Sequence, residues 1–226
     1  MFGETSMKLR AVILDMDGTI TRFNIDYLRA RRMVLAELEK MKLKTADMTE
    51  QSSIYLLLKQ LKPRLDSETY GRLRKLFYSR LEEMEIKAAR EVMLYPGVFD
   101  TMNKLRGREL LIGLVTNNGR KGTSLTLKRL GLKLFFDAVV TRDDCEEMKP
   151  DPGPIRRVLE ELKVGVDEAI FVGDGVMDIM AAREAGLCSV AVSTGPFEME
   201  RLLHSKPDYV LGSVSDLPNL IDSLES

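Results

Sequence analysis

The sequence predicts an α/β fold: a Rossmann-like parallel sheet core with helices on both faces and an inserted α-helical cap. The first observation behind this prediction is that short apolar segments alternate with helical segments from residue 98 onward. Such alternation produces right-handed βαβ units and a mostly parallel sheet. The second observation is a long helical stretch without a convincing strand, which follows the first apolar segment of the chain.

The expected core elements follow one another regularly along the chain. Residues 8–14, which end in the first apolar segment Ala11-Val12-Ile13-Leu14, read as a buried strand. Gly131 and Gly186 each follow an expected helix directly, at the position where a left-handed residue commonly ends a helix. The further strands are expected at 110–115, 138–141, 169–172, 189–192 and 209–211, and the helices at 98–105, 121–130, 154–162, 178–185 and from about 217.

The helical stretch covers about residues 24–90. A second helix within it is expected at 49–61, before Pro63, and a third at about 67–89. The first helix is indicated by apolar residues at helical spacing, namely Ile25, Leu28, Leu35, Leu38 and Met41. Tyr95-Pro96-Gly97 then breaks the helical pattern. We therefore predict a core domain at residues 1–21 and 95–226, and an α-helical cap at residues 22–94.

Charge and composition limit the possible classes of function. The chain of 226 residues is long enough for a core with an inserted subdomain, and its net charge of −1 argues against general nucleic-acid binding. Residues 22–94 contain 16 Lys and Arg against 11 Asp and Glu, whereas the remainder contains 18 against 24. A basic cap over an acidic core suits a metal-binding site under a lid that favours anions. Solvated helix faces explain the same asymmetry equally well.

Cysteine usage and hydropathy indicate the compartment. Cys145 and Cys188 are too few and too far apart for a disulfide framework, which favours the reducing cytoplasm. Residues 1–10 lack the apolar region of a signal peptide. The longest apolar runs, such as 110–115, are far shorter than a membrane span. We therefore expect a cytoplasmic protein without a membrane or nucleic-acid partner.

The first motif is Asp15-Met16-Asp17-Gly18-Thr19, directly after the first apolar segment. Two carboxylates two residues apart at a strand end reach the same side of the sheet rim. Two like charges held together cost free energy unless a cation or protons neutralise them. A divalent metal beside a nucleophilic carboxylate is the simplest use of such a pair, although acids and glycine are also common in ordinary turns.

The second motif ends the strand expected at 110–115 and reads Thr116-Asn117-Asn118-Gly119. A hydroxyl and amide groups beside a helix start can donate hydrogen bonds to a phosphate oxygen. The competing interpretation is helix N-capping by Thr116 or Asn118.

The remaining two motifs also follow expected strands. Lys149 stands between Met148 and Pro150, and the following prolines restrict the position of its ammonium group. It is expected to bind phosphate and offset the repulsion between acids, or else to be an ordinary surface lysine. Asp174 and Asp178 follow the strand at 169–172 and suit a hard cation, directly or through water. A turn with an acid at a helix N-terminus explains Asp178 well but Asp174 poorly.

Together the motifs resemble those of the haloacid dehalogenase (HAD) superfamily. Asp15–Thr19, Thr116, Lys149, and Asp174 with Asp178 match its four motifs in order. The helical insertion lies between the first and second motifs, as in phosphoglycolate-phosphatase-like members. The resemblance covers essentially the whole chain, and it identifies the superfamily far more specifically than the substrate.

The resemblance implies a role for each matching residue. Asp15 would be the nucleophile that forms a phosphoaspartate, and Asp17 the general acid and then base. Mg²⁺ would be held by the Asp15 carboxylate, the Asp17 backbone carbonyl and Asp174, with Asp178 in or near its shell. An acid at the Asp17 position argues for phosphoryl transfer, since halide leaving groups need no proton.

The second and third motifs, by the same resemblance, would hold the phosphoryl oxygens through Thr116, Asn117 and Lys149. One segment departs from the family pattern: Ile20-Thr21-Arg22-Phe23-Asn24 stands where many relatives have Leu and then Asp-Ser. This departure lies at the first hinge into the cap and affects substrate identity. Arg22 or Asn24 contacts substrate, or Arg22 is an ordinary surface residue of the hinge.

The leading hypothesis is a Mg²⁺-dependent phosphatase, a monomer or homodimer, that acts on a small phosphorylated metabolite. One alternative is a phosphosugar mutase of the β-phosphoglucomutase type, which shares these motifs but releases little free phosphate. The other alternative is a non-catalytic phosphate-binding module.

Overall fold

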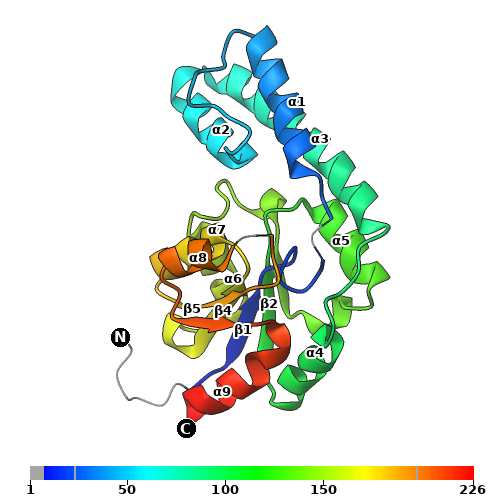
Figure 1. The fold of residues 1–226 in the computed structure, drawn as a ribbon, viewed down its shortest axis with the longest axis vertical. Helices are drawn as coiled ribbons and strands as arrows, with labels where there is room; N and C mark the ends of the chain where they lie inside the picture. The colour runs from blue at the N-terminus through cyan, green and yellow to red at the C-terminus, as the bar shows by residue number, and fades with distance from the viewer. Residues whose placement is uncertain (1–7, 23, 197) are drawn as a thin grey trace.

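The computed structural model describes residues 8–22, 24–196 and 198–226. Within these residues, six parallel strands form one sheet in the order β3-β2-β1-β4-β5-β6, with helices packed around it (Figure 1). This confirms the predicted α/β class. The strands are β1 (Ala11–Leu14), β2 (Leu111–Val115), β3 (Ala138–Val140), β4 (Ala169–Gly173), β5 (Cys188–Val192) and β6 (Tyr209–Leu211). Residues 1–7 of the predicted core and Phe23 of the predicted hinge lie outside this description.

Two apolar layers cover the two faces of the sheet, because successive side chains of a strand point to opposite faces. Val12 and Leu14 of β1 belong to one layer, to which α4, α5 and α9 contribute. Ala11 and Ile13 belong to the other, formed with α6 and α7. The helices of this part of the chain are α4 (Val98–Gly107), α5 (Arg120–Arg129), α6 (Gly153–Leu162), α7 (Val176–Ala185), α8 (Met199–His204) and α9 (Leu217–Glu225).

The position of β1 in the sheet determines where a ligand can bind. β1 pairs with β2 on one side and with β4 on the other, so the strand order reverses at β1. In open parallel sheets, ligands bind beyond the carboxyl ends of the strands at such a switch point. The residues after β1, β2 and β4 are therefore brought together by the topology.

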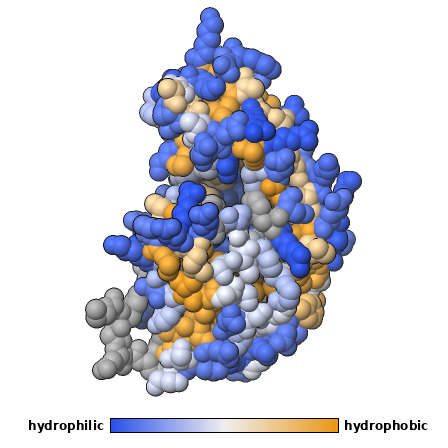
Figure 2. Space-filling model, viewed as in Figure 1, coloured by the Kyte–Doolittle hydropathy of each residue, from blue (hydrophilic) through white to orange (hydrophobic). Residues whose placement is uncertain are grey.

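Three of the helices between β1 and β2 form a third apolar cluster, apart from the two layers of the sheet, and we call them the three-helix unit. They are α1 (Tyr27–Lys40), α2 (Ile54–Leu61) and α3 (Ser67–Ala89). Leu38, Leu57 and Phe77, one from each helix, are buried against one another in a cluster separate from the two layers of the sheet. Figure 1 shows this unit at one end of the molecule, and Figure 2 shows a hollow in the surface where it meets the rest.

Local capping bonds explain where two of these helices begin. The Ser53 hydroxyl accepts the N–H of Leu56, so α2 starts at Ile54 and not at the expected residue 49. The Asp66 carboxylate accepts the N–H of Thr69 at the start of α3, as expected. Such side-chain acceptors satisfy amide groups that the first helical turn leaves without intrahelical partners.

Two linkers join the three-helix unit to the rest of the chain, and they run side by side. The Arg22 N–H donates to the Met93 carbonyl over 2.8 Å, and Thr21 forms an antiparallel bridge with Leu94.

Among the described residues, no helix combines the length and the apolar character required to cross a bilayer.

Candidate active site

The seven residues to which sequence analysis assigned catalytic, phosphate-binding or metal-binding roles all line one cavity of about 150 Å³. Asp15 follows β1, Thr116 follows β2 and Asp174 follows β4, so the ends of three adjacent strands supply the floor of the cavity. The three-helix unit supplies the opposite wall. The candidates that line this cavity are Asp15, Asp17, Thr116, Asn117, Lys149, Asp174 and Asp178.

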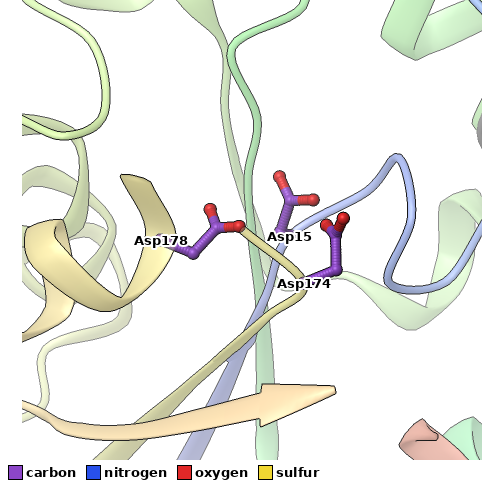
Figure 3. A group of neighbouring side chains, drawn as sticks. All are labelled: Asp15, Asp174 and Asp178. Carbon is purple, nitrogen blue, oxygen red and sulfur yellow. The ribbon is translucent and has the colours of Figure 1, made fainter. Parts of the chain in front are cut away.

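Three buried carboxylates form the centre of the site. Asp15, Asp174 and Asp178 each offer an oxygen atom, and these atoms lie within 4.8 Å of one another. Figure 3 shows the three side chains gathered from the end of β1, the end of β4 and the start of α7. Gly18 permits this approach, because a Cβ there would collide with the Asp174 carboxylate and its φ is +91°.

A buried lysine lies between two of these acids. Lys149 Nζ is 2.5 Å from Asp15 Oδ1 and 2.6 Å from Asp178 Oδ1, and it donates to the Val115 carbonyl over 3.0 Å. Burial by itself lowers the pKa of Lys149, but the two carboxylates outweigh burial and raise it above its usual value. Lys149 is therefore a cation of the site and not a surface lysine.

The backbone of Lys149 is fixed by Asn117. The Asn117 side-chain amide donates to the Lys149 carbonyl over 2.9 Å, and its oxygen accepts the Lys149 N–H over 3.1 Å. The amide that sequence analysis assigned to phosphate is thus occupied by the segment that carries the lysine. Asn117 joins the second and third motifs, which are 32 residues apart in the chain.

Asp174 carries the least compensated charge of the cluster. Burial, followed by repulsion from Asp15 and Asp178, raises its pKa to about 9. Its side-chain hydrogen bond comes from the Thr19 hydroxyl over 3.2 Å. Burial also raises the pKa of Asp15 to about 7, although Lys149 acts in the opposite direction.

These residues fit a divalent cation. Lys149 contacts Asp15 and Asp178 but forms no ion pair with Asp174, so one positive charge faces three carboxylates in this part of the described chain. Mg²⁺ prefers oxygen ligands and is usually held by one or two carboxylates together with waters and phosphate oxygens, which this cluster can supply in part. Neutralising this cluster would also remove the unfavourable burial of charge.

Asp17 lies beside the cluster and is held by two donors. Its Oδ1 accepts from the Thr21 hydroxyl over 3.0 Å, and its Oδ2 accepts from the Asn118 amide over 2.5 Å. Burial raises the pKa of Asp17 to about 6, while these two hydrogen bonds lower it. A carboxyl group with a pKa near neutrality is suited to exchange protons with a substrate.

Asn118 belongs to the site, where its amide binds a carboxylate, whereas sequence analysis offered either a phosphate oxygen for the amides of this motif or a helix cap for Asn118. The N-cap of α5 is Gly119, which makes no side-chain capping bond, so the capping interpretation is wrong for Asn118. Its amide donates to Asp17, and its oxygen accepts from the Tyr27 hydroxyl over 2.6 Å. Thr116 Oγ1 accepts the Asn118 N–H over 3.2 Å and is likewise not a cap.

A buried ion pair joins the three-helix unit to the site, and sequence analysis missed it. Arg142 Nη1 lies 2.5 Å from Glu85 Oε1, and both side chains are almost fully buried. Glu85 Oε2 also accepts the Gly119 N–H over 2.9 Å, while Arg142 donates to the Asn117 carbonyl over 3.2 Å. The available signal was that Glu85 continues the four-residue spacing of the buried Leu73, Phe77 and Leu81 on α3.

The three-helix unit also contacts the segment that precedes Lys149. The Tyr55 hydroxyl donates to Glu147 over 2.8 Å, and Lys62 lies 2.8 Å from Glu146. The hinge candidates, in contrast, do not line the cavity. Arg22 is exposed, and the Asn24 amide donates to the Ala88 carbonyl over 3.0 Å.

Comparison with known proteins identifies the family. A family model described as haloacid dehalogenase-like hydrolase matches residues 12–192. A protein named pyrophosphatase PpaX from Bacillus mycoides is 32% identical over 220 residues, which cover 93% of this chain and 96% of that protein. A protein of the same name from Bacillus velezensis is 38% identical over 123 residues, which cover 54% of this chain and 57% of that protein.

Solved structures share the fold at lower identity. A hydrolase from Pseudomonas syringae has a TM-score of 0.72 at 23% identity, covering 96% of this chain and all of its own. A predicted phosphoglycolate phosphatase from Haemophilus somnus has a TM-score of 0.64 at 22% identity, covering 96% of this chain and 99% of its own. The match of the family model over most of the chain confirms the resemblance inferred from the motifs: the chain belongs to the haloacid dehalogenase-like hydrolase family.

Proposed function

We propose that this protein is a Mg²⁺-dependent phosphatase that hydrolyses a small phosphomonoester through a phosphoaspartate on Asp15. The observation that carries the proposal is the buried Asp15 carboxylate, which contacts Lys149 and faces two further acids in a cavity. The neighbouring ammonium favours the ionised form of the Asp15 carboxyl group, and this form can attack phosphorus. The names of the PpaX relatives support phosphoryl chemistry and make inorganic diphosphate a substrate to test.

In the first step, an Asp15 oxygen forms a bond to phosphorus as the bond to the leaving oxygen breaks. Asp17 donates its proton to that oxygen, which leaves as an alcohol. In the second step, water attacks phosphorus, Asp17 accepts the proton of the water, and the Asp15 carboxylate is released with inorganic phosphate. The raised pKa of Asp17, about 6, supports both directions of proton transfer.

The phosphoryl oxygens need positioning and charge compensation more than further covalent chemistry. Lys149 supplies a fixed positive charge, and Thr116 Oγ1, which accepts the Asn118 N–H, can donate its own hydrogen to a phosphoryl oxygen. Asn117 contributes by fixing the Lys149 backbone. Mg²⁺, held by Asp15, Asp174, Asp178 and the Asp17 backbone carbonyl, would neutralise charge on the phosphoryl group.

The three-helix unit fits the role of a cap with boundaries near residues 22 and 94. Its own apolar cluster and the adjacent linkers at Arg22 and Met93 support this division. The cavity between this unit and the sheet suits a small phosphorylated metabolite. The two cysteines are free thiols, in keeping with a cytoplasmic enzyme.

The decisive assay measures phosphate release from a panel of metabolite phosphates, inorganic diphosphate and p-nitrophenyl phosphate. Each is assayed with Mg²⁺, with EDTA and with Asp15→Asn. We expect turnover that requires Mg²⁺ and disappears in the variant. Activity that survives Asp15→Asn would overturn the nucleophile assignment, and absence of turnover on the whole panel would overturn the phosphatase.

A further inference from the structure

The three-helix unit supplies one wall of the cavity, and among the described residues this wall carries one charged side chain. This side chain is Arg31 of α1. The other residues of the unit that line the cavity are uncharged, namely Tyr27, Ser53, Ile54, Tyr55 and Leu81. The floor of the cavity holds the carboxylates and Lys149, so Arg31 provides positive charge on the side opposite the acidic cluster.

Arg31 differs from the other cations of the cavity in its partners. Arg142 is paired with Glu85, and Lys149 is paired with Asp15. Arg31 instead donates to the Glu50 backbone carbonyl over 3.1 Å, and no described carboxylate lies within ion-pair distance of it.

The guanidinium of Arg31 is thus held in place by a neutral group. One of its five N–H donors is used in this bond. The side chain is half-buried, and burial lowers its pKa, partly offset by Tyr27. A half-buried cation without a counter-charge favours an anion from outside the chain.

The start of α2 adds a second source of positive potential on the same wall. Ser53, Ile54 and Tyr55, its N-cap and first two residues, line the cavity together with Arg31. The N-terminus of a helix carries partial positive charge and favours anions. A guanidinium and a helix N-terminus therefore lie on the same wall of the cavity, the one that the three-helix unit supplies.

We infer that Arg31 and the first turn of α2 bind a second anionic group, carried by the leaving group of the substrate. This inference rests on the proposed phosphatase function and narrows its substrate class. The favoured substrates are small phosphoryl compounds whose leaving group is itself anionic, through a second phosphate or a carboxylate. A cavity of about 150 Å³ restricts them to a few heavy atoms beyond the phosphoryl group.

The test compares three substrates that differ in the charge of the leaving group. Inorganic diphosphate offers a second phosphate, 2-phosphoglycolate a carboxylate, and ethyl phosphate a neutral group of the same carbon count. The variants are Arg31→Gln, Arg31→Lys and the neighbouring Arg32→Gln as control. Arg32 is exposed and pairs with Glu50 at the surface, 3.0 Å away.

We expect Arg31→Gln to lower kcat/KM about 10- to 100-fold for a substrate with an anionic leaving group, mainly by raising KM. This fold-change is the range expected for the loss of a hydrogen bond to a charged group. Ethyl phosphate should change less than about twofold, and Arg31→Lys should fall between. A loss for diphosphate alone or for phosphoglycolate alone identifies the second anion as phosphate or carboxylate. An equal loss on all three substrates, no loss, or the same pattern in Arg32→Gln would overturn the inference.

A binding measurement keeps the test independent of turnover. Methylenediphosphonate, whose P–C–P bridge resists hydrolysis, should bind the wild-type protein with Mg²⁺ at least tenfold more tightly than methylphosphonate in calorimetry, and Arg31→Gln should remove this preference. Equal affinity for the two compounds in the wild type would overturn the anion site. Failure of the proposed function looks different: wild-type turnover is then absent or survives Asp15→Asn, and the inference falls with it.

Discussion

Lys149 Nζ lies 2.5 Å from Asp15 Oδ1 within a buried group of acids, so the ionised form of the proposed nucleophile is favoured by a neighbour that comes 134 residues later in the chain. The same ammonium lies 2.6 Å from Asp178, and Asn117 holds the Lys149 backbone from both sides. Lys149 thus connects the charge of the site to its geometry. Its replacement should affect both.

We predict that Lys149→Met lowers kcat for phosphate release by about 100-fold or more, the scale seen when a single preorganised electrostatic group is removed. Without the ammonium, the pKa of Asp15 rises further above about 7, and less of the carboxylate is ionised. Steady-state assays with saturating Mg²⁺ measure the effect, with the exposed Lys128→Met on α5 as control. A loss of less than tenfold would contradict the role of Lys149.

The positions of the acids could be predicted because they follow from topology. Parallel strands end at one edge of the sheet, so residues directly after β1, β2 and β4 must be neighbours whatever the side chains between them. The segment of Lys149 is added to this edge by Asn117. The strand pattern therefore located the acids that follow β1 and β4, whereas the place of Lys149 depends on its contact with Asn117.

The opposite wall could not be predicted in the same way. The pairing of Glu85 with Arg142 depends on how the three-helix unit sits on the core, which no local pattern encodes. Arg31 likewise is one of 16 Lys and Arg residues in 22–94, and no local pattern distinguishes it from the others. The start of α2 differs from the predicted one for a local reason, because Ser53 caps the helix and it begins at Ile54.

The Glu85–Arg142 pair predicts a strong coupling in stability. Because both side chains are buried, Glu85→Leu or Arg142→Met leaves a charge without its partner and should lower the free energy of unfolding by about 3–5 kcal/mol. The double variant should lose clearly less than the sum of the two single losses. Urea unfolding of all four proteins measures this coupling.

The matched control is the Lys121–Glu82 pair, which also involves α3 but joins it to α5 at the surface, with the lysine 73% exposed. Its removal should cost less than about 1 kcal/mol. Additive losses at Glu85 and Arg142 would show that the pair does not act as a unit.

Metal removal should make stability depend on pH through Asp174. Its pKa in the metal-free protein is about 9, against an ordinary value of 3.8, chiefly through burial. The folded state therefore holds a proton that the unfolded state releases between these values. In EDTA, stability associated with this group is fully present below about pH 4 and is lost as pH rises toward 9.

Thermal unfolding of the wild type and Asp174→Asn in EDTA, at pH 5 and pH 8, checks this sign. The melting temperature of the asparagine variant should be higher than that of the wild type, and the difference should be larger at pH 8 than at pH 5. Mg²⁺ should stabilise the wild type more at pH 8 than at pH 5, and the variant little at either pH. A gain that is larger at pH 5 would contradict the assignment.

The last prediction concerns a chain of hydrogen bonds from the three-helix unit to the proposed general acid. The Tyr27 hydroxyl donates to Asn118 over 2.6 Å, and the Asn118 amide donates to Asp17. Tyr27→Phe removes the bond that fixes the direction of this amide, so Asp17 is less well oriented toward the leaving oxygen. We expect kcat to fall about 5- to 10-fold, corresponding to about 1 kcal/mol. Tyr70→Phe, on α3 and absent from the cavity lining, should leave kcat unchanged. A fall in melting temperature without a fall in kcat would assign Tyr27 to packing alone.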